Sequence, residues 1–178
     1  MKLLLHVCCA PCANAPIEKL RQEGTEVTSF WYNPNIHPFT EHKSRKNGMV
    51  AYSQAISLPL VIGGEYGLRS FLSGVGEDIE GRCRFCYQDR LETTAKYAKE
   101  NGFDGFTTTL MISPYQNHDL MKEIAEEMAE KHQIPFIYQD FRPLFREGQQ
   151  RARELEIYMQ KYCGCIFSEE ERYQKKKK

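Results

Sequence analysis

The sequence of 178 residues lacks long apolar runs, a net charge and internal repeats. Its first apolar stretch, residues 3–7, is far shorter than the roughly 20 apolar residues that a membrane-spanning helix needs. No charged and then apolar leader with a small-residue cleavage site precedes the first cysteines. We therefore expect a cytoplasmic protein with no membrane partner. Because 24 basic and 24 acidic residues cancel, overall charge neither requires nor excludes a nucleic-acid partner.

The chain also lacks a low-complexity linker and any shift in composition that would mark a domain boundary. Its length suits one hydrophobic core, so we expect a single domain over residues 1–178. Four lysines end the sequence, and we expect residues 173–178 to form a disordered basic tail. Contact with phosphate is the alternative for these lysines.

Cysteine, in contrast, is abundant, with seven residues in three groups. In the cytoplasm thiols stay reduced, so an odd number of cysteines favours metal binding or redox catalysis over structural disulfides. The three groups are Cys8, Cys9 and Cys12; Cys83 and Cys86; and Cys163 and Cys165.

Segments with strand-like and helix-like patterns alternate along the chain. Strands are expected at residues 3–7, 27–32, 59–62, 104–110 and 134–138. Helices are expected at residues 13–23, 41–56, 82–101, 119–131 and 149–162, with one short helix between 65 and 81. This order predicts a three-layer α/β/α fold with a mostly parallel five-stranded sheet. Such sheets bind ligands beyond the carboxyl ends of their strands, where the first cysteine group lies.

The first two cysteine groups both suit metal ligation. Cys8, Cys9 and Cys12 lie where a strand turns into a helix, and the helix dipole there lowers thiol pKa. The alternative is that one or two of them are small buried hydrophobic residues. Cys83 and Cys86 form a C-x-x-C, which by itself suits zinc, a redox dithiol or iron–sulfur ligation. Together the two groups supply the four thiolates of a zinc site or a [4Fe–4S] cube.

The third cysteine group has a single glycine between its two thiols. Cys163 and Cys165 can form only a strained and easily reduced disulfide, which suits thiol–disulfide exchange. Two further metal ligands or a packed turn are the alternatives. Proton donors for catalysis are open among Tyr115, Asp140, His37 and bound water, since these residues follow expected strands.

Several short motifs occur in an order that resembles the epoxyqueuosine reductase QueH family, from about residue 3 to residue 172. Each motif is weak by itself, and their number and order make the resemblance specific. The motifs are CCAPC after the first strand, Asn33-Pro34-Asn35-Ile36, the box from Arg82 and Cys83 to Cys86, FTTTL at residues 106–110 with Ser113-Pro114, Asp140-Phe141-Arg142, KYCGC at residues 161–165 and FSEEER at residues 167–172.

The resemblance implies reduction of epoxyqueuosine at the tRNA wobble position to queuosine, the last step of queuosine synthesis, by a cobalamin-independent enzyme supplied by an electron donor. It implies a [4Fe–4S] cluster with an adjacent mononuclear iron. Carried over position by position, the cluster ligands are Cys8, Cys9, Cys83 and Cys86, the residue at the iron is Cys12, and the redox-active pair is Cys163 and Cys165.

The implied fold is related to the nucleotide α-hydrolase-like (HUP-like) layer. The chain has no Ser-Gly-Gly-x-Asp-Ser pyrophosphate loop after its first strand, so we expect no ATP chemistry. A modified base in an anticodon loop must be splayed out of its stack to reach a metal. Arg82, Arg84, Arg142 and Arg146 are expected to meet the phosphates of that loop.

Two functions from other classes fit the same cysteines. One is a zinc-stabilised tRNA- or protein-binding module, in which four thiolates form a closed structural site. The other is a thiol–disulfide oxidoreductase without a cluster. Iron and acid-labile sulfide in an anaerobically purified sample separate both alternatives from the reductase.

Overall fold

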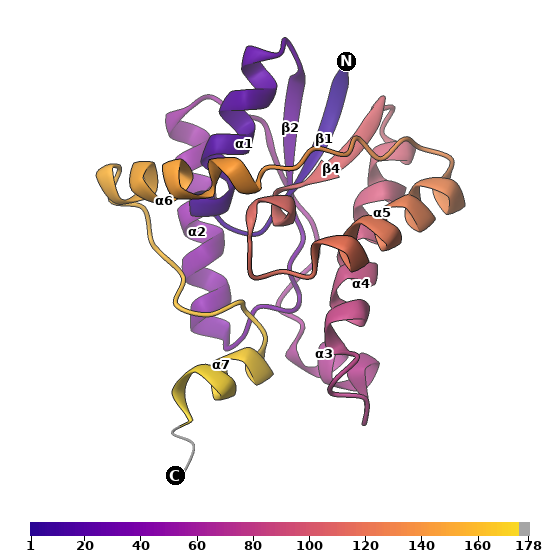
Figure 1. The fold of residues 1–178 in the computed structure, drawn as a ribbon, viewed down its shortest axis with the longest axis vertical. Helices are drawn as coiled ribbons and strands as arrows, with labels where there is room; N and C mark the ends of the chain where they lie inside the picture. Colours follow the sequence, from indigo (N-terminus) through magenta and orange to yellow (C-terminus); the bar gives the residue numbers. More distant parts are fainter. Residues whose placement is uncertain (175–178) are drawn as a thin grey trace.

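The computed structural model describes residues 1–174 and contains a four-stranded parallel sheet in the order β3-β2-β1-β4. β1 (Lys2–Val7) lies at the centre, between β2 (Glu26–Trp31) and β4 (Gly105–Thr108), and β3 (Leu60–Ile62) forms the edge beside β2 (Figure 1). The leucines of β1 are fully buried. Parallel strands covered on both faces carry such unbroken apolar runs, which is why this strand was recognisable in the sequence.

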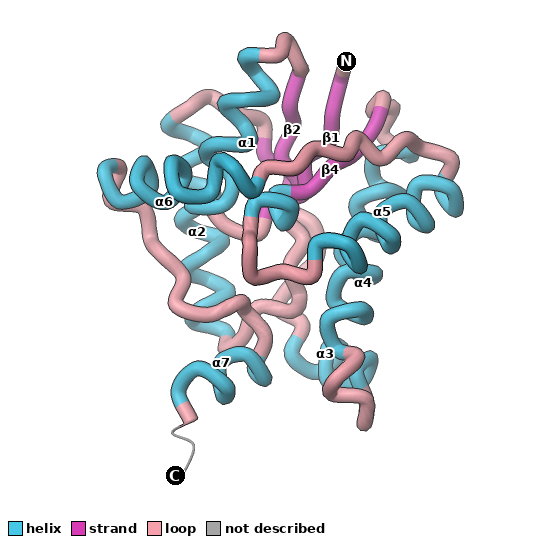
Figure 2. Tube along the Cα trace, in the orientation of Figure 1, coloured by secondary structure: helices cyan, strands magenta, loops and turns pink. Residues whose placement is uncertain are grey.

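Helices cover both faces of the sheet. α1 (Ala10–Gln22) packs against β1, β2 and α2 (Phe39–Ala55), whereas α4 (Arg82–Glu100) packs against β1, β4 and α5 (His118–His132). The two helix pairs lie on opposite sides of the strands (Figures 1 and 2). The predicted α/β class with a parallel sheet between helical layers is therefore confirmed. None of the helices in residues 1–174 has the length and apolar character needed to cross a membrane.

The fifth strand expected at residues 134–138 is wrong, because this segment makes only one parallel bridge, between Phe106 and Phe136. The Phe106 N–H donates to the Pro135 carbonyl at 3.0 Å, and the Ile137 N–H donates to the Phe106 carbonyl at 2.8 Å. Pro135 has no N–H for a ladder, and the chain leaves the sheet after this bridge. The sheet thus has four strands and one residue of a fifth.

The strand expected at residues 104–110 ends early, at Thr108. The Thr108 hydroxyl accepts the Leu110 N–H at 3.1 Å, which starts a short 3₁₀ helix, η1 (Thr109–Ile112). A hydroxyl that captures a nearby backbone N–H in this way competes with strand pairing. The chain consequently bends at the carboxyl edge of the sheet and brings Thr109 beside the first cysteine group.

The C-terminal region departs most from the prediction. The expected helix at 149–162 is displaced to α6 (Phe145–Glu154), after a 3₁₀ turn, η2 (Arg142–Leu144). Glu156 adopts a left-handed conformation (φ 54°), and the Ile157 N–H bonds back to the Ala152 carbonyl at 2.9 Å, which ends the helix. Residues 157–165 are therefore a loop.

Two further helices complete the fold. α3 (Leu68–Val75) confirms the short helix expected between residues 65 and 81. α7 (Ile166–Tyr173) was not expected, and it takes Tyr173 from the segment predicted to be a disordered tail. Gln174 follows as the C-cap of this helix, and the rest of the predicted tail, residues 175–178, lies outside the described residues.

Candidate active site

The first cysteine group lies at the carboxyl end of β1, in the turn into α1. Cys9 caps the helix with extended backbone (φ −169°, ψ 160°), and Pro11 occupies the first turn, where its missing N–H breaks no helical hydrogen bond. The sulfurs of Cys8, Cys9 and Cys12 lie within 4.8 Å of one another, and all three side chains are buried. The fold thus gathers the three thiols into one donor set that can hold a metal ion.

These three thiols share their protons unequally. Hydrogen bonding with Cys12 and Cys9 lowers the pKa of Cys8 well below its usual value. Burial raises the pKa of Cys9, and the hydrogen bond to Cys8 raises the pKa of Cys12. Because a metal ion binds thiolates, its binding at this group would release protons from the thiols.

A cavity of about 790 Å³ opens above Cys8 and Cys12. Its lining comes from segments far apart in the sequence, including η1, α6, the 157–165 loop and α7 (Figure 1). Among the described residues, the lining includes six cationic side chains and no carboxylate. The cations are Arg45, Arg90, Arg146, Arg153, Lys161 and Arg172. A concave surface of one charge sign attracts an anionic ligand.

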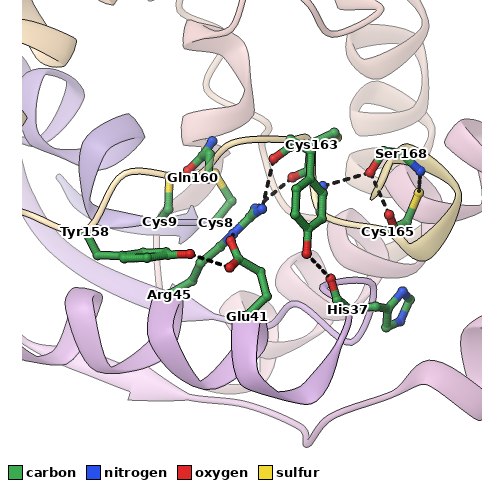
Figure 3. A network of polar contacts seen from close by, with 12 residues as sticks. Cys8, Cys9, His37, Glu41, Arg45, Tyr158, Gln160, Cys163, Cys165 and Ser168 are labelled. Carbon is green, nitrogen blue, oxygen red and sulfur yellow. Dashed lines mark hydrogen bonds and ion pairs between the residues drawn. The ribbon is translucent and has the colours of Figure 1, made fainter. Parts of the chain in front are cut away.

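Arg45, on α2, holds the loop that carries the third cysteine group. Its side chain is buried, and its guanidinium donates to the carbonyls of Tyr162 at 2.9 Å and Cys163 at 2.7 Å (Figure 3). Its Nε donates to Glu41 at 2.8 Å. These bonds place the exposed thiol of Cys163 in the cavity wall, where it accepts a hydrogen bond from Gln116 at 3.3 Å.

Cys165 points away from this cavity. Its buried sulfur accepts the Ser168 N–H at 3.4 Å and so caps α7 (Figure 3). The intervening Gly164 has φ 155°, and a Cβ there would lie 3.3 Å from both Arg45 Nη1 and Ile36 Cγ1. All seven cysteines are free thiols in this structure. The Cys163 thiol is accessible from the cavity, whereas the buried Cys165 thiol is not.

Cys83 and Cys86 lie near the start of α4. Their sulfurs do not belong to the group of three thiols that could hold a metal ion. Cys83 is exposed, whereas the partly buried Cys86 packs against a small apolar cluster of Phe71, Val75 and Cys165. Burial raises the pKa of Cys86 to about 12, although Arg90 donates to its sulfur at 3.1 Å. Arg90 is also an electrostatic neighbour of Cys8, so this buried guanidinium links the two cysteine groups.

Of the expected proton donors, only Tyr115 lines the cavity, and its side chain is 86% exposed. Asp140 lies outside the lining, and hydrogen bonds from Arg142 lower its pKa to about 2. His37 is buried with both ring nitrogens bonded to backbone groups, and burial lowers its pKa to about 4. The geometry therefore disfavours Asp140 and His37 as proton donors at neutral pH.

Three of the four arginines expected to meet phosphate are instead paired with carboxylates and do not line the cavity. These pairs are Arg82 with Glu171, Arg84 with Glu123, and Arg142 with Asp140. Arg146 alone among the four lies in the lining.

The sequence of this chain is similar to known proteins over nearly its whole length. The sequence model of the family described as "Epoxyqueuosine reductase QueH" matches residues 3–171. The chain belongs to the QueH family. A relative named "Epoxyqueuosine reductase QueH" from Dehalococcoides mccartyi is 38% identical over 174 residues, covering 98% of this chain and 96% of the relative. One of the same name from Thermotoga maritima is 37% identical over 183 residues, covering 97% and 93%.

Solved structures that resemble this QueH chain support its fold alone. A predicted subunit of a tRNA methyltransferase from Methanocaldococcus jannaschii has a TM-score of 0.54 at 12% identity, covering 82% of this chain and 75% of that one. A deacetylase of the teicoplanin biosynthesis pathway has a TM-score of 0.53 at 11% identity, covering 86% and 83%. Both likenesses agree with the α/β class of the QueH chain.

Several cavity residues of this QueH chain were missed in the sequence. Arg45 and Arg90 are buried cations on helices, and no local pattern distinguishes them from solvent-exposed arginines. Lys161 and Arg172 reach the cavity through the loop after α6 and through α7, which were not predicted correctly. Arg153 forms a basic ridge with Arg146 in the sequence, for which a solvated helix face is the simpler interpretation; its spacing of seven residues from Arg146 puts both on one helical face.

Proposed function

We propose that this chain is an epoxyqueuosine reductase, which removes the epoxide oxygen of epoxyqueuosine at the tRNA wobble position and yields queuosine. The QueH family match defines the reaction class. The observation that carries the proposal for this chain is the set of three buried thiols beneath a cavity with cationic walls. A tRNA substrate makes the cytoplasm the site of action, and we keep the proposal that residues 1–178 form one domain.

The three thiols gathered at the end of β1 suit the cofactors that the family resemblance implies. Thiolates are the ligands of iron–sulfur clusters, and Cys8, Cys9 and Cys12 offer buried sulfurs within 4.8 Å of one another. We propose that Cys8 and Cys9 hold a [4Fe–4S] cluster with Cys83 and Cys86, and that Cys12 holds an adjacent iron. Once bound, these groups supply single electrons and a Lewis acid for the epoxide oxygen.

The protein side chains have separate tasks in this proposal. The cationic cavity walls bind the anionic substrate and orient its modified base toward the thiols. Arg45 fixes the loop that carries Cys163. Reduction of the epoxide consumes two electrons and two protons and releases water. Oxidation of Cys163 and Cys165 to a disulfide, for which the Cys165 sulfur must leave its cap position on α7, returns two electrons and two protons. Cys163 is the thiol that an electron donor in the cavity meets first.

The function is tested with tRNA that carries epoxyqueuosine. The anaerobically purified, reduced protein is incubated with this tRNA, and the nucleosides are analysed by mass. We expect the mass of one oxygen atom to disappear from the modified nucleoside, and the protein to contain iron and acid-labile sulfide. Colourless protein that contains zinc and leaves the nucleoside unchanged would instead support the zinc-stabilised binding module.

A further inference from the structure

One side of α6 faces the cavity and, after Phe145 at the first position of the helix, carries polar side chains. We call it the α6 polar face; it consists of Arg146, Gln149, Gln150 and Arg153. The spacing i, i+3, i+4 and i+7 places these residues on one stripe of the helix. On another side Gly148 and Ala152 are buried, and a Cβ at Gly148 would contact Ala15 of α1 at 3.4 Å. Packing against α1 therefore fixes which side of α6 faces the ligand.

The arginines of the α6 polar face are not neutralised by the protein. Within residues 1–174, Arg146 and Arg153 make no ion pair. Arg151 on the same helix, in contrast, pairs with Glu18 and Glu147 and does not line the cavity. On this helix, Arg151 is paired with carboxylates away from the cavity, whereas Arg146 and Arg153 face the cavity and are available to an anionic ligand.

An exposed aromatic ring stands at the same cavity. The side chain of Tyr115 is 86% exposed, and its ring meets Phe145 edge to face, with 5.9 Å between the ring centroids. Both rings line the cavity. A large ring left open to solvent at a cationic surface is a stacking platform for nucleobases, all of which have an aromatic face.

We propose that the α6 polar face and Tyr115 bind an unpaired RNA strand, with phosphates on the two arginines and one base stacked on the tyrosine ring. The strand is unpaired because a nucleotide reaches the buried thiols only when it is splayed out of a helix. The two glutamines of the face offer amide groups to base edges and 2′-hydroxyls. This inference rests on the proposed function, and it assigns Tyr115 to positioning of the RNA instead of proton donation.

The charge component is tested through the salt dependence of binding. The probe is an anticodon stem-loop hairpin without epoxyqueuosine, so that binding is measured apart from reduction. For the double variant Arg146→Gln/Arg153→Gln, we expect the slope of log K against log salt to become shallower by about 1.4, at about 0.7 for each lost single-strand phosphate contact. The control Arg151→Gln removes a paired cation from the same helix and should keep the wild-type slope. An unchanged slope in the double variant, or an equal change in the control, would overturn the inference.

The stacking component is tested with two substitutions at Tyr115. Tyr115→Ala should weaken hairpin binding by about tenfold, within the usual range for a base on an aromatic platform. Tyr115→Phe keeps the ring and should bind the hairpin more tightly than Tyr115→Ala, because stacking needs the ring and not the hydroxyl. If Tyr115→Phe binds normally but loses turnover, the hydroxyl acts chemically and the stacking role is wrong. Unchanged binding by Tyr115→Ala would refute it as well.

Competition with other substrates separates this inference from the proposed function. We expect duplex RNA of equal length to compete weakly with the hairpin, and equal competition would contradict binding of an unpaired strand. If the hairpin binds as described while tRNA with epoxyqueuosine keeps its oxygen, the proposed reaction fails and the RNA-binding surface stands. If the tRNA is reduced normally by the Arg146→Gln/Arg153→Gln variant at limiting tRNA concentration, the reaction stands and the surface fails.

Discussion

At the scale of single residues, a buried charge fixes the loop beside the cavity. Arg45 is 2% exposed and bonds two carbonyls of the loop beside the cavity as well as a carboxylate of its own helix. A planar guanidinium can bond several acceptors in fixed directions, which an ammonium group cannot do. Arg45 is therefore a positioning residue for the loop around Cys163.

We predict that Arg45→Met lowers the free energy of unfolding by roughly 3 kcal/mol, because it removes the cationic partner of the largely buried Glu41 carboxylate, which among the described residues keeps only the hydrogen bond from the Tyr158 hydroxyl. Arg45→Lys keeps the charge but not the two carbonyl bonds, so its loss should be smaller. Urea denaturation measures both variants, and alkylation of Cys163 in the native protein reports on the loop. A decrease below about 1 kcal/mol for Arg45→Met, with unchanged alkylation, would contradict the role of Arg45.

Buried His37 makes stability depend on pH. Burial lowers its pKa from 6.5 to about 4, so the unfolded chain takes up a proton before the folded protein does. The contribution of neutral His37 to the free energy of unfolding is present in full above about pH 6.5 and is lost as the pH falls towards 4. We expect the free energy of unfolding to fall by about 2 kcal/mol between pH 7.5 and pH 5 from this residue. Urea midpoints of wild type and His37→Gln measure the difference, and equal pH slopes would refute it.

At the scale of elements, the cavity depends on a loop whose conformation needs glycine. Gly164 separates Cys163, which faces the cavity, from Cys165, which caps α7. Its φ of 155° is rarely adopted by other residues, and the space beside it is occupied by Arg45 and Ile36. The different surroundings of the two thiols thus follow from one backbone position.

We predict that Gly164→Ala lowers the free energy of unfolding by about 2 kcal/mol and changes the alkylation rate of Cys163, because backbone strain and close contact act together. Gly24→Ala is the matched control, since Gly24 also has a positive φ (78°) but nothing within 4 Å of an added Cβ. It should cost only about 1 kcal/mol and leave Cys163 unchanged. Equal effects of the two substitutions would show that the contacts with Arg45 and Ile36 are unimportant.

Elements with strong local signals were predictable from the sequence, and the others were not. β1 and α1 follow from an apolar run and helical periodicity, and so the first cysteine group was placed correctly at the strand end. Residues 134–138 have strand-like composition, but pairing depends on a partner edge and on Pro135. The end of α6 depends on the left-handed turn at Glu156, a non-glycine residue with no sequence signal for that conformation. The part of the cavity wall that comes from α6, the 157–165 loop and α7 could consequently not be predicted from the sequence.

At the scale of the whole molecule, the proposed centre joins chain segments that only the complete fold brings together. The first three thiols lie in the turn between β1 and α1, whereas Cys83 and Cys86 begin α4 on the opposite face of the sheet. The buried guanidinium of Arg90 is an electrostatic neighbour of both groups. The two cysteine groups can therefore bind one proposed cluster only when both helical layers are packed on the sheet.

We predict that Cys83→Ala abolishes the iron–sulfur chromophore, because it removes one of four proposed thiolate ligands. Cys163→Ser should retain iron and sulfide and lose turnover only when thiols are the reductant, because this thiol lies in the cavity wall and belongs to the proposed redox-active pair. Iron and sulfide analysis, the visible spectrum and nucleoside masses measure the two variants side by side. Full iron and sulfide in Cys83→Ala would refute the ligand assignment. Unchanged thiol-driven turnover in Cys163→Ser would remove the pair from the mechanism but leave the metal centre in place, since the two roles belong to different segments of the fold.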